Sequence, residues 1–113
     1  MATIRDYSGR ILYKIEGGQV RDFNGRTLKK YDDNRITDYS GRVEYKIRGN
    51  ELTDYTGRVL YKIDGSELKD FYGRTLCRYT GSEIKDYSGR VMYKIDGYLF
   101  TEELFALYAI IEP

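Results

Sequence analysis

Apolar and polar positions recur along this chain with a period of sixteen residues, from residue 4 to residue 97. Each block opens on an aliphatic residue, reaches an aspartate two positions later, and continues through an aromatic residue, a variable residue, glycine and arginine. The six aspartates are Asp6, Asp22, Asp38, Asp54, Asp70 and Asp86. Self-similarity at a fixed period is the signature of a repeat architecture. We therefore expect each block to form one small structural unit.

Repeat four shows how such a unit folds. Asp54–Gly57 predicts a type I turn in which the aspartate accepts a backbone N–H two residues on. Gly57 supplies the left-handed residue that forms a bulge. The run 58–64 is rich in β-branched and aromatic residues and predicts a strand. Gly65-Ser66 favours a tight type II′ hairpin loop, and Asp33-Asn34 in repeat two favours type I′.

Six such units predict an all-β fold of about twelve short antiparallel strands. Repeats two and five differ from the others in the same way: phenylalanine replaces tyrosine, threonine replaces valine or isoleucine, and the long strand ends in tyrosine. The two odd repeats lie 48 residues apart, which divides the chain into the halves 4–51 and 52–99. We therefore hypothesise four three-stranded sheets around an axis, each about the smallest stable sheet.

The alternation of the long strands predicts that both of their faces are buried over much of their length. Val59, Tyr61 and Ile63 share one face of a strand and Leu60 lies on the other, so both faces are apolar over much of the length. Burial of both faces needs packed layers or sheets that radiate from a common centre. The consistently polar position holds Lys14, Lys30, Lys46, Lys62, Arg78 and Lys94.

The repeat ends after Gly97, and residues 98–113 predict one short apolar helix. Thr101 suits the cap position, and Glu102 and Glu103 suit the positive first turn. No charge occurs from residue 104 to residue 111, and a helix that is apolar all round must be buried all round. Two compatible interpretations are a plug that closes the β-assembly and an oligomer contact. The contact residues would be Leu104, Phe105, Leu107, Tyr108 and Ile111.

The repeated unit with its apolar tail resembles the small bacterial proteins grouped as the four-fold β-flower family. The resemblance rests on turns such as Asp38-Tyr39-Ser40-Gly41 and on strands such as Tyr93-Lys94-Ile95. It covers nearly the whole chain. It implies a fold and implies no activity.

Composition narrows the classes of function. The 113 residues are 41% apolar and 33% charged, which predicts one folded domain over 1–113. The formal net charge of +1 disfavours a strong field for nucleic acid. The row of lysines is the one candidate for a nucleic-acid groove, and eighteen acidic residues offset it.

No apolar run is long enough to span a membrane. No signal peptide is visible, so a cytoplasmic location is the default expectation.

Catalytic chemistry finds little support. The chain has no histidine and a single cysteine, Cys77, so an imidazole base and an intrachain disulfide are ruled out. The carboxylate pairs Asp32-Asp33 and Glu102-Glu103 have local reasons in a turn and a helix start. In each repeat we expect the aspartate to pair with the arginine of its own turn. The sequence therefore predicts a non-enzyme with no catalytic residue, metal site or cofactor.

Two kinds of function remain. The first is a structural or interaction protein that associates with itself. The alternative is a module that binds a glycan or another small ligand, because tyrosine and phenylalanine rings stack on flat apolar faces. The candidate rings are Tyr7, Phe23, Tyr39, Tyr55, Phe71 and Tyr87. Exposed rings would favour ligand binding, whereas rings packed over neighbouring turns would not.

Overall fold

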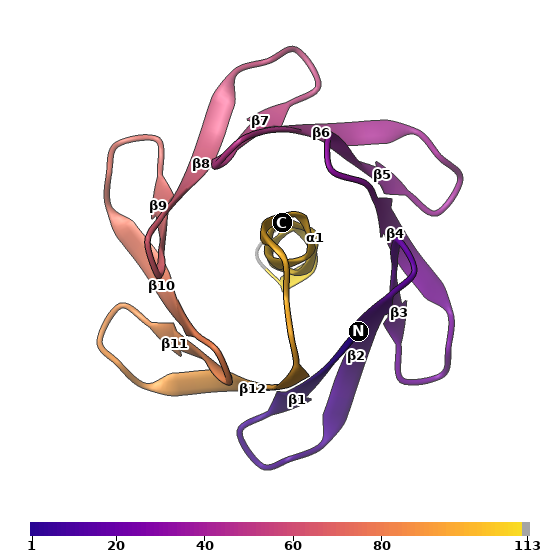
Figure 1. The fold of residues 1–113 in the computed structure, drawn as a ribbon, viewed down its shortest axis with the longest axis vertical. Helices are drawn as coiled ribbons and strands as arrows, with labels where there is room; N and C mark the ends of the chain where they lie inside the picture. Colours follow the sequence, from indigo (N-terminus) through magenta and orange to yellow (C-terminus); the bar gives the residue numbers. More distant parts are fainter. Residues whose placement is uncertain (112–113) are drawn as a thin grey trace.

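The structure is a computed structural model that describes residues 1–111, and its strands close into one barrel around a single helix (Figure 1). The all-β class with one C-terminal helix is confirmed. The elements are β1 (Ala2–Asp6), β2 (Ile11–Glu16), β3 (Gln19–Asp22), β4 (Thr27–Tyr31), β5 (Arg35–Asp38), β6 (Val43–Arg48), β7 (Glu51–Asp54), β8 (Val59–Asp64), β9 (Glu67–Asp70), β10 (Thr75–Thr80), β11 (Glu83–Asp86), β12 (Val91–Gly97) and α1 (Thr101–Ile111).

Every strand pairs with its two neighbours in sequence, and β1 pairs with β12 to close the ring. At this seam Ile4 lies opposite Ile95, and on its other side Ile4 lies opposite Tyr13. The prediction of four three-stranded sheets is therefore wrong. The barrel is one continuous sheet, because closure gives every backbone edge a partner and leaves no edge strand.

The bulged turns form as predicted. In repeat four Gly57 has a φ of 100° and donates its N–H to the Asp54 carbonyl at 3.0 Å. The pairing of β7 with β8 shifts register between Leu52 and Thr53, which is the bulge. A positive φ is readily adopted by glycine and strained for other residues, so this glycine fixes where each long strand begins.

The tight turns follow the predictions only in part. Gly65 has a positive φ of 63°, as a type II′ loop requires. Among residues 1–111, however, only glycines have a positive φ. Asp33 and Asn34 in the loop of repeat two therefore lack it, and the prediction of a type I′ turn there is wrong. Asp32 holds that loop instead: its carboxylate accepts the N–H groups of Asn34 and Arg35 at 2.8 and 2.9 Å. The aspartate side chain replaces the backbone geometry that glycine would supply.

The inner wall of the barrel is made by the first residue of each repeat and by two positions of each long strand. The first residues are 0–2% exposed, and they are Ile4, Val20, Ile36, Leu52, Leu68 and Ile84. Tyr61 and Ile63 of β8 pack against the same core. The opposite face is less covered than the sequence suggested, because Leu60 is half-buried and Lys62 is exposed.

Helix α1 fills the lumen of the barrel. A ring of twelve strands is wider than one that its own side chains can fill, and the view along the barrel shows α1 inside the ring (Figure 1). Phe105, Ala106 and Leu107 are completely buried. No buried side-chain polar atom among residues 1–111 lacks a hydrogen-bond partner. The helix is thus an internal plug. No helix in this part of the chain has both the length and the apolarity that crossing a membrane requires.

The helix is shorter than the predicted span 98–113. It starts at Thr101, and residues 112–113 lie outside the described residues. Phe100 holds the cap position in place of Thr101, because its carbonyl accepts the N–H of Leu104 at 2.9 Å. Glu103 returns the bond by accepting the N–H of Phe100 at 2.9 Å. This is the carboxylate half of a capping box.

The odd repeats hold the start of the helix. Their inward-facing tyrosines, Tyr31 and Tyr79, stand where other repeats have isoleucine. Tyr31 donates its hydroxyl to Glu103 at 2.5 Å, and Tyr79 donates its hydroxyl to the carbonyl of Leu99 at 3.4 Å. Because they are three repeats apart in a ring of six, the two tyrosines approach the helix from opposite sides. This contact accounts for the longer period.

The bond between Tyr31 and Glu103 gives a test of this arrangement. Tyr31→Phe should lower the free energy of unfolding by about 1–3 kcal/mol, because it leaves a buried carboxylate short of a donor. Tyr79→Phe should cost less, since it removes a longer bond to a backbone carbonyl. The control is Tyr7→Phe, at an exposed ring. Urea unfolding measures the stability of all three variants. Equal stability of the Tyr31 and Tyr7 variants would show that the bond between Tyr31 and Glu103 does not stabilise the fold.

Candidate functional site

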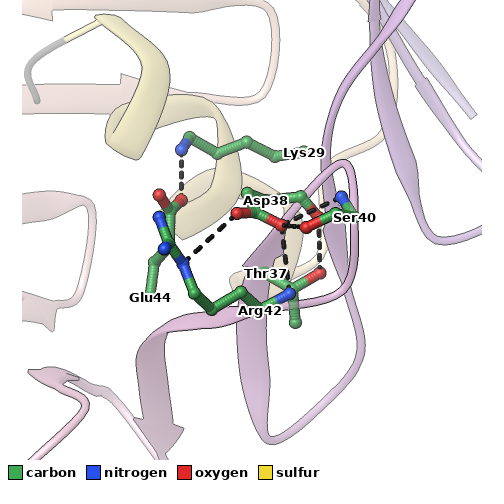
Figure 2. A network of polar contacts seen from close by, with 6 residues as sticks. All are labelled: Lys29, Thr37, Asp38, Ser40, Arg42 and Glu44. Atoms are coloured by element: carbon green, nitrogen blue, oxygen red, sulfur yellow. Dashed lines mark hydrogen bonds and ion pairs between the residues drawn. The ribbon is translucent and has the colours of Figure 1, made fainter.

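The bulged turn of each repeat is a compact polar loop built on its aspartate, shown for repeat three in Figure 2. One carboxylate oxygen of Asp38 accepts the N–H of Ser40 at 2.9 Å, the hydroxyl of Ser40 at 2.7 Å and the N–H of Arg42 at 3.0 Å. The other oxygen lies 3.5 Å from Nε of Arg42. The predicted Asp–Arg pair therefore exists, and the aspartate serves the turn.

These bonds also stabilise the charged form of the aspartates. The Ser40 hydroxyl, followed by the N–H of Arg42, lowers the pKa of Asp38 from its ordinary value of 3.8. Hydrogen bonds to a carboxylate act in this direction because they favour the ionised state. A turn hydroxyl lowers the pKa in the same way at Asp6, Asp54 and Asp86. At Asp70, which has no hydroxyl partner, the N–H of Arg74 is the largest cause of the lowered pKa.

The turns project their aromatic rings into solvent. The six rings proposed from the sequence are 59–74% exposed, and they are Tyr7, Phe23, Tyr39, Tyr55, Phe71 and Tyr87. They are therefore not buried under neighbouring turns. The turns that carry them point outward as separate projections around the ring (Figure 1), so the rings are distributed around the rim and do not form one row.

Grooves lie between the long strand of one repeat and the turn of the next. The groove between repeats four and five has a volume of about 480 Å³ and is lined by Arg58–Tyr61 on one side and by Phe71, Tyr72 and Arg74 on the other. The groove at Tyr7 has a volume of about 570 Å³ and closes against 90–92 of repeat six. The same arrangement thus recurs where the ring closes.

Two further grooves follow the same plan with different linings. At Phe23 the groove has a volume of about 320 Å³ and includes Lys14 and Arg21. At Tyr87 it has a volume of about 270 Å³ and reaches the helix at Tyr108 and Ile111. The position of a turn ring at the edge of each groove is the shared feature.

An ion pair links repeats two and three. Lys29 stands where other repeats have tyrosine or cysteine, and Glu44 stands where they have leucine or methionine. The two side chains meet in a hydrogen-bonded salt bridge, which Figure 2 shows beside the turn of Asp38. Two departures from the repeat thus compensate each other.

Sequence reasoning missed two contributors to the grooves. Tyr72 follows the turn ring of repeat five, at a position held elsewhere by serine, asparagine or threonine. The turn arginines form the second set, with side chains 78–83% exposed, and they are Arg10, Arg26, Arg42, Arg58, Arg74 and Arg90. Both signals are visible in the aligned repeats, but only the tertiary structure places these groups beside the rings.

The residues proposed as an oligomer contact lie in the core of the single chain. Leu104, Phe105, Leu107 and Tyr108 are buried in the barrel, and Ile111 is half-buried beside the groove of Tyr87. The apolar segment therefore finds its partner within its own chain. Burial in the lumen removes these four side chains from any surface that a second copy could contact.

The remaining reactive groups do not converge. Cys77 is buried in β10. Within residues 1–111 no group of three or more His, Cys, Asp or Glu residues is placed to hold a metal ion. The row of lysines lies on the outer wall, where for example Lys62 pairs with Glu51 at 3.7 Å and Arg78 pairs with Glu67 at 3.3 Å.

Comparisons with protein-family models, with curated proteins and with solved structures returned no match. The resemblance to the β-flower family thus stays a prediction.

The lowered pKa values of the turn aspartates predict acid sensitivity. Their folded pKa lies below 3.8, so the unfolded chain binds more protons, and acid favours unfolding. The stabilisation should be complete above about pH 5 and should disappear as the pH falls through the folded pKa values. Asp38→Asn, which keeps an oxygen acceptor, should reduce this pH dependence in urea unfolding between about pH 5 and pH 2.

The matched control for this experiment is Asp33→Asn, at an exposed aspartate of a tight turn. It should leave the slope of stability against pH close to that of the unmodified protein. If the two variants have the same slope, the bonds within the bulged turn do not set the acid sensitivity.

Proposed function

We propose that this protein is a non-catalytic interaction module that binds glycans in the grooves between its repeats. The observation that carries the proposal is the exposure of all six turn rings, at 59–74%. Exposure of aromatic rings to water is unfavourable in free energy, and exposed rings that gather at concave sites mark interaction surfaces. Each ring here is held by a hydrogen-bonded turn, and four of the six rings line a groove: Tyr7, Phe23, Phe71 and Tyr87.

The chemistry of the groove suits a sugar ring. An aromatic face stacks on the apolar C–H face of a sugar, and the rigid turn limits the conformational entropy lost on binding. The guanidinium of the turn arginine supplies hydrogen-bond donors beside the ring. Tyr7 with Arg90 in one groove and Phe71 with Arg74 in another illustrate the combination.

Repetition compensates for the weakness of a single site. Six turns on one closed ring present their rings at fixed positions, and a branched or repeating ligand that engages several of them gains affinity through effective concentration. A multivalent glycan is a ligand of this kind. The barrel supplies the rigidity, because every strand is paired on both edges.

The environment of the potentially reactive side chains supports a non-catalytic role. The turn aspartates are engaged in turn bonds, as Asp38 shows. Cys77 is buried, and the chain has no histidine. Nucleophilic or general acid–base chemistry needs an activated group with a partner beside it. Self-association is left out of the proposal, because the helix that suggested it is buried in its own barrel.

A glycan array followed by titration calorimetry tests the proposal. The triple variant Tyr7→Ser, Tyr39→Ser, Tyr87→Ser removes half of the turn rings, and each lost stacking contact should weaken its site about two- to tenfold. The apparent affinity for a multivalent hit should fall by more than tenfold. Three wall lysines changed to serine (Lys30, Lys46 and Lys62) form the matched control, and they should have a small effect. Arrays without any hit, or equal losses in both variants, would overturn the proposal.

A further inference from the structure

The groove between repeats four and five differs from the others in its aromatic edge. Phe71 and Tyr72 are in edge-to-face contact, with ring centroids 4.7 Å apart and an interplanar angle of 75°. Tyr72 is 86% exposed. The two rings form a corner that can contact a ligand ring on two sides, whereas the other turns carry one ring each.

The turn of repeat five does not need the ring of Tyr72 for its stability. In repeats one, three and six the same position holds a serine whose hydroxyl bonds the turn aspartate, as Ser40 does to Asp38 at 2.7 Å. Repeat five keeps only the backbone bond, from Tyr72 N–H to Asp70 at 2.9 Å. A turn bond has thus been replaced by a solvent-exposed ring, which is the exchange expected at a binding site.

The polar groups of this groove are mainly donors. One oxygen of Asp70 accepts the N–H groups of Tyr72 and Arg74 at 2.9 and 3.0 Å. The other oxygen accepts the Nε–H of Arg74 at 3.1 Å and lies 3.1 Å from Nη2 of the same guanidinium. The Asp70 side chain is 14% exposed and is engaged by its own turn, so it offers a ligand little acceptor surface.

The two arginines keep donors free. Nε of Arg58 lies 3.6 Å from the carboxylate of Asp54, which leaves its terminal N–H groups available, and Arg74 bonds Asp70 through one edge of its guanidinium. Both arginines line the same groove. Apart from tyrosine hydroxyls, the groove therefore offers N–H donors that carry positive charge, and these are best satisfied by an anionic acceptor.

We propose that the groove between repeats four and five binds an acidic sugar, with its ring against Phe71 and Tyr72 and its carboxylate or sulfate on Arg58 and Arg74. This inference rests on the proposed function and names the ligand class for one of its sites. A terminal sugar is favoured over nucleic acid, because each turn arginine pairs with its own aspartate and the net charge is +1. No continuous basic track for a phosphate backbone results.

The test rests on an acidic oligosaccharide and its neutral ester, with a sulfated sugar and a single-stranded nucleic acid as further probes. Amide shifts and calorimetry are recorded with a tetragalacturonate, with its neutral methyl ester, with a sulfated disaccharide and with oligothymidine. The acid should bind about tenfold more tightly than the ester, with shifts at residues 58–61 and 70–74. Comparison of the carboxylate with the sulfate distinguishes the two sources of the same anionic chemistry, and binding of either one supports the inference.

Two variants locate the effect. Tyr72→Ser restores the residue found in three other repeats and should weaken binding of the acid about two- to tenfold. Arg58→Gln, which removes one of the two cationic partners of the anion, should reduce the preference for acid over ester. Lys30→Gln, which removes an exposed positive charge from the wall, is the control for general electrostatics.

The outcomes separate the two proposals. Equal affinity for acid and ester together with no binding of the sulfated disaccharide, or shifts by glycans only at other turns, would overturn the acidic-sugar site and leave the glycan-binding function standing. Absence of shifts at every turn with all sugars, including the hits of the array, would overturn both. Tighter binding of oligothymidine than of the acid, at the same residues, would overturn the inference in favour of nucleic acid.

Discussion

The width of the barrel is the constraint on which the rest of this structure depends. Twelve short strands enclose a lumen wider than their own inward side chains can fill, and an unfilled apolar lumen would forfeit packing contacts and leave a destabilising cavity. Helix α1 supplies the missing volume, with Phe105 and Leu107 fully buried. This explains why a strongly repetitive β-chain ends in a segment of different chemistry, and why that segment has no charge from residue 104 to residue 111.

Insertion of one helix into a six-repeat ring breaks the symmetry of the ring, and the sequence shows where. A single helix start has one carboxylate and a few backbone groups that need partners, so most repeats meet the helix with aliphatic side chains. Two repeats on opposite sides meet it with tyrosine hydroxyls, Tyr31 on Glu103 and Tyr79 on the Leu99 carbonyl. Lys29 and Glu44 are a second local departure from the repeat, and their opposite charges compensate each other.

Each turn contains residues that hold the fold and residues that the fold leaves exposed. The aspartate and the glycine of each turn are committed to the fold, the first through its hydrogen bonds and the second through its positive φ. The aromatic ring and the arginine are held by the turn but stay largely exposed. A rigid scaffold that carries exposed loop residues is the usual basis of binding. Repetition multiplies the arrangement, and a single exchange, Tyr72 for a small polar residue, is enough to give one groove its own character.

The sequence by itself determined the local structure, because turn chemistry and strand alternation act over a few residues. The period of sixteen, the bulged turns such as Asp54–Gly57 and the apolar helix could all be predicted, and the candidate rings were identified by their place in the repeat. The tertiary structure alone decided the closure of the strands into one barrel, since β1 meets β12 across the whole length of the chain. It also decided that the helix lies within that barrel, and that Arg58 and Arg74 share a groove with Phe71 and Tyr72. These are long-range juxtapositions that depend on ring closure, a property of all twelve strands together that no single repeat encodes.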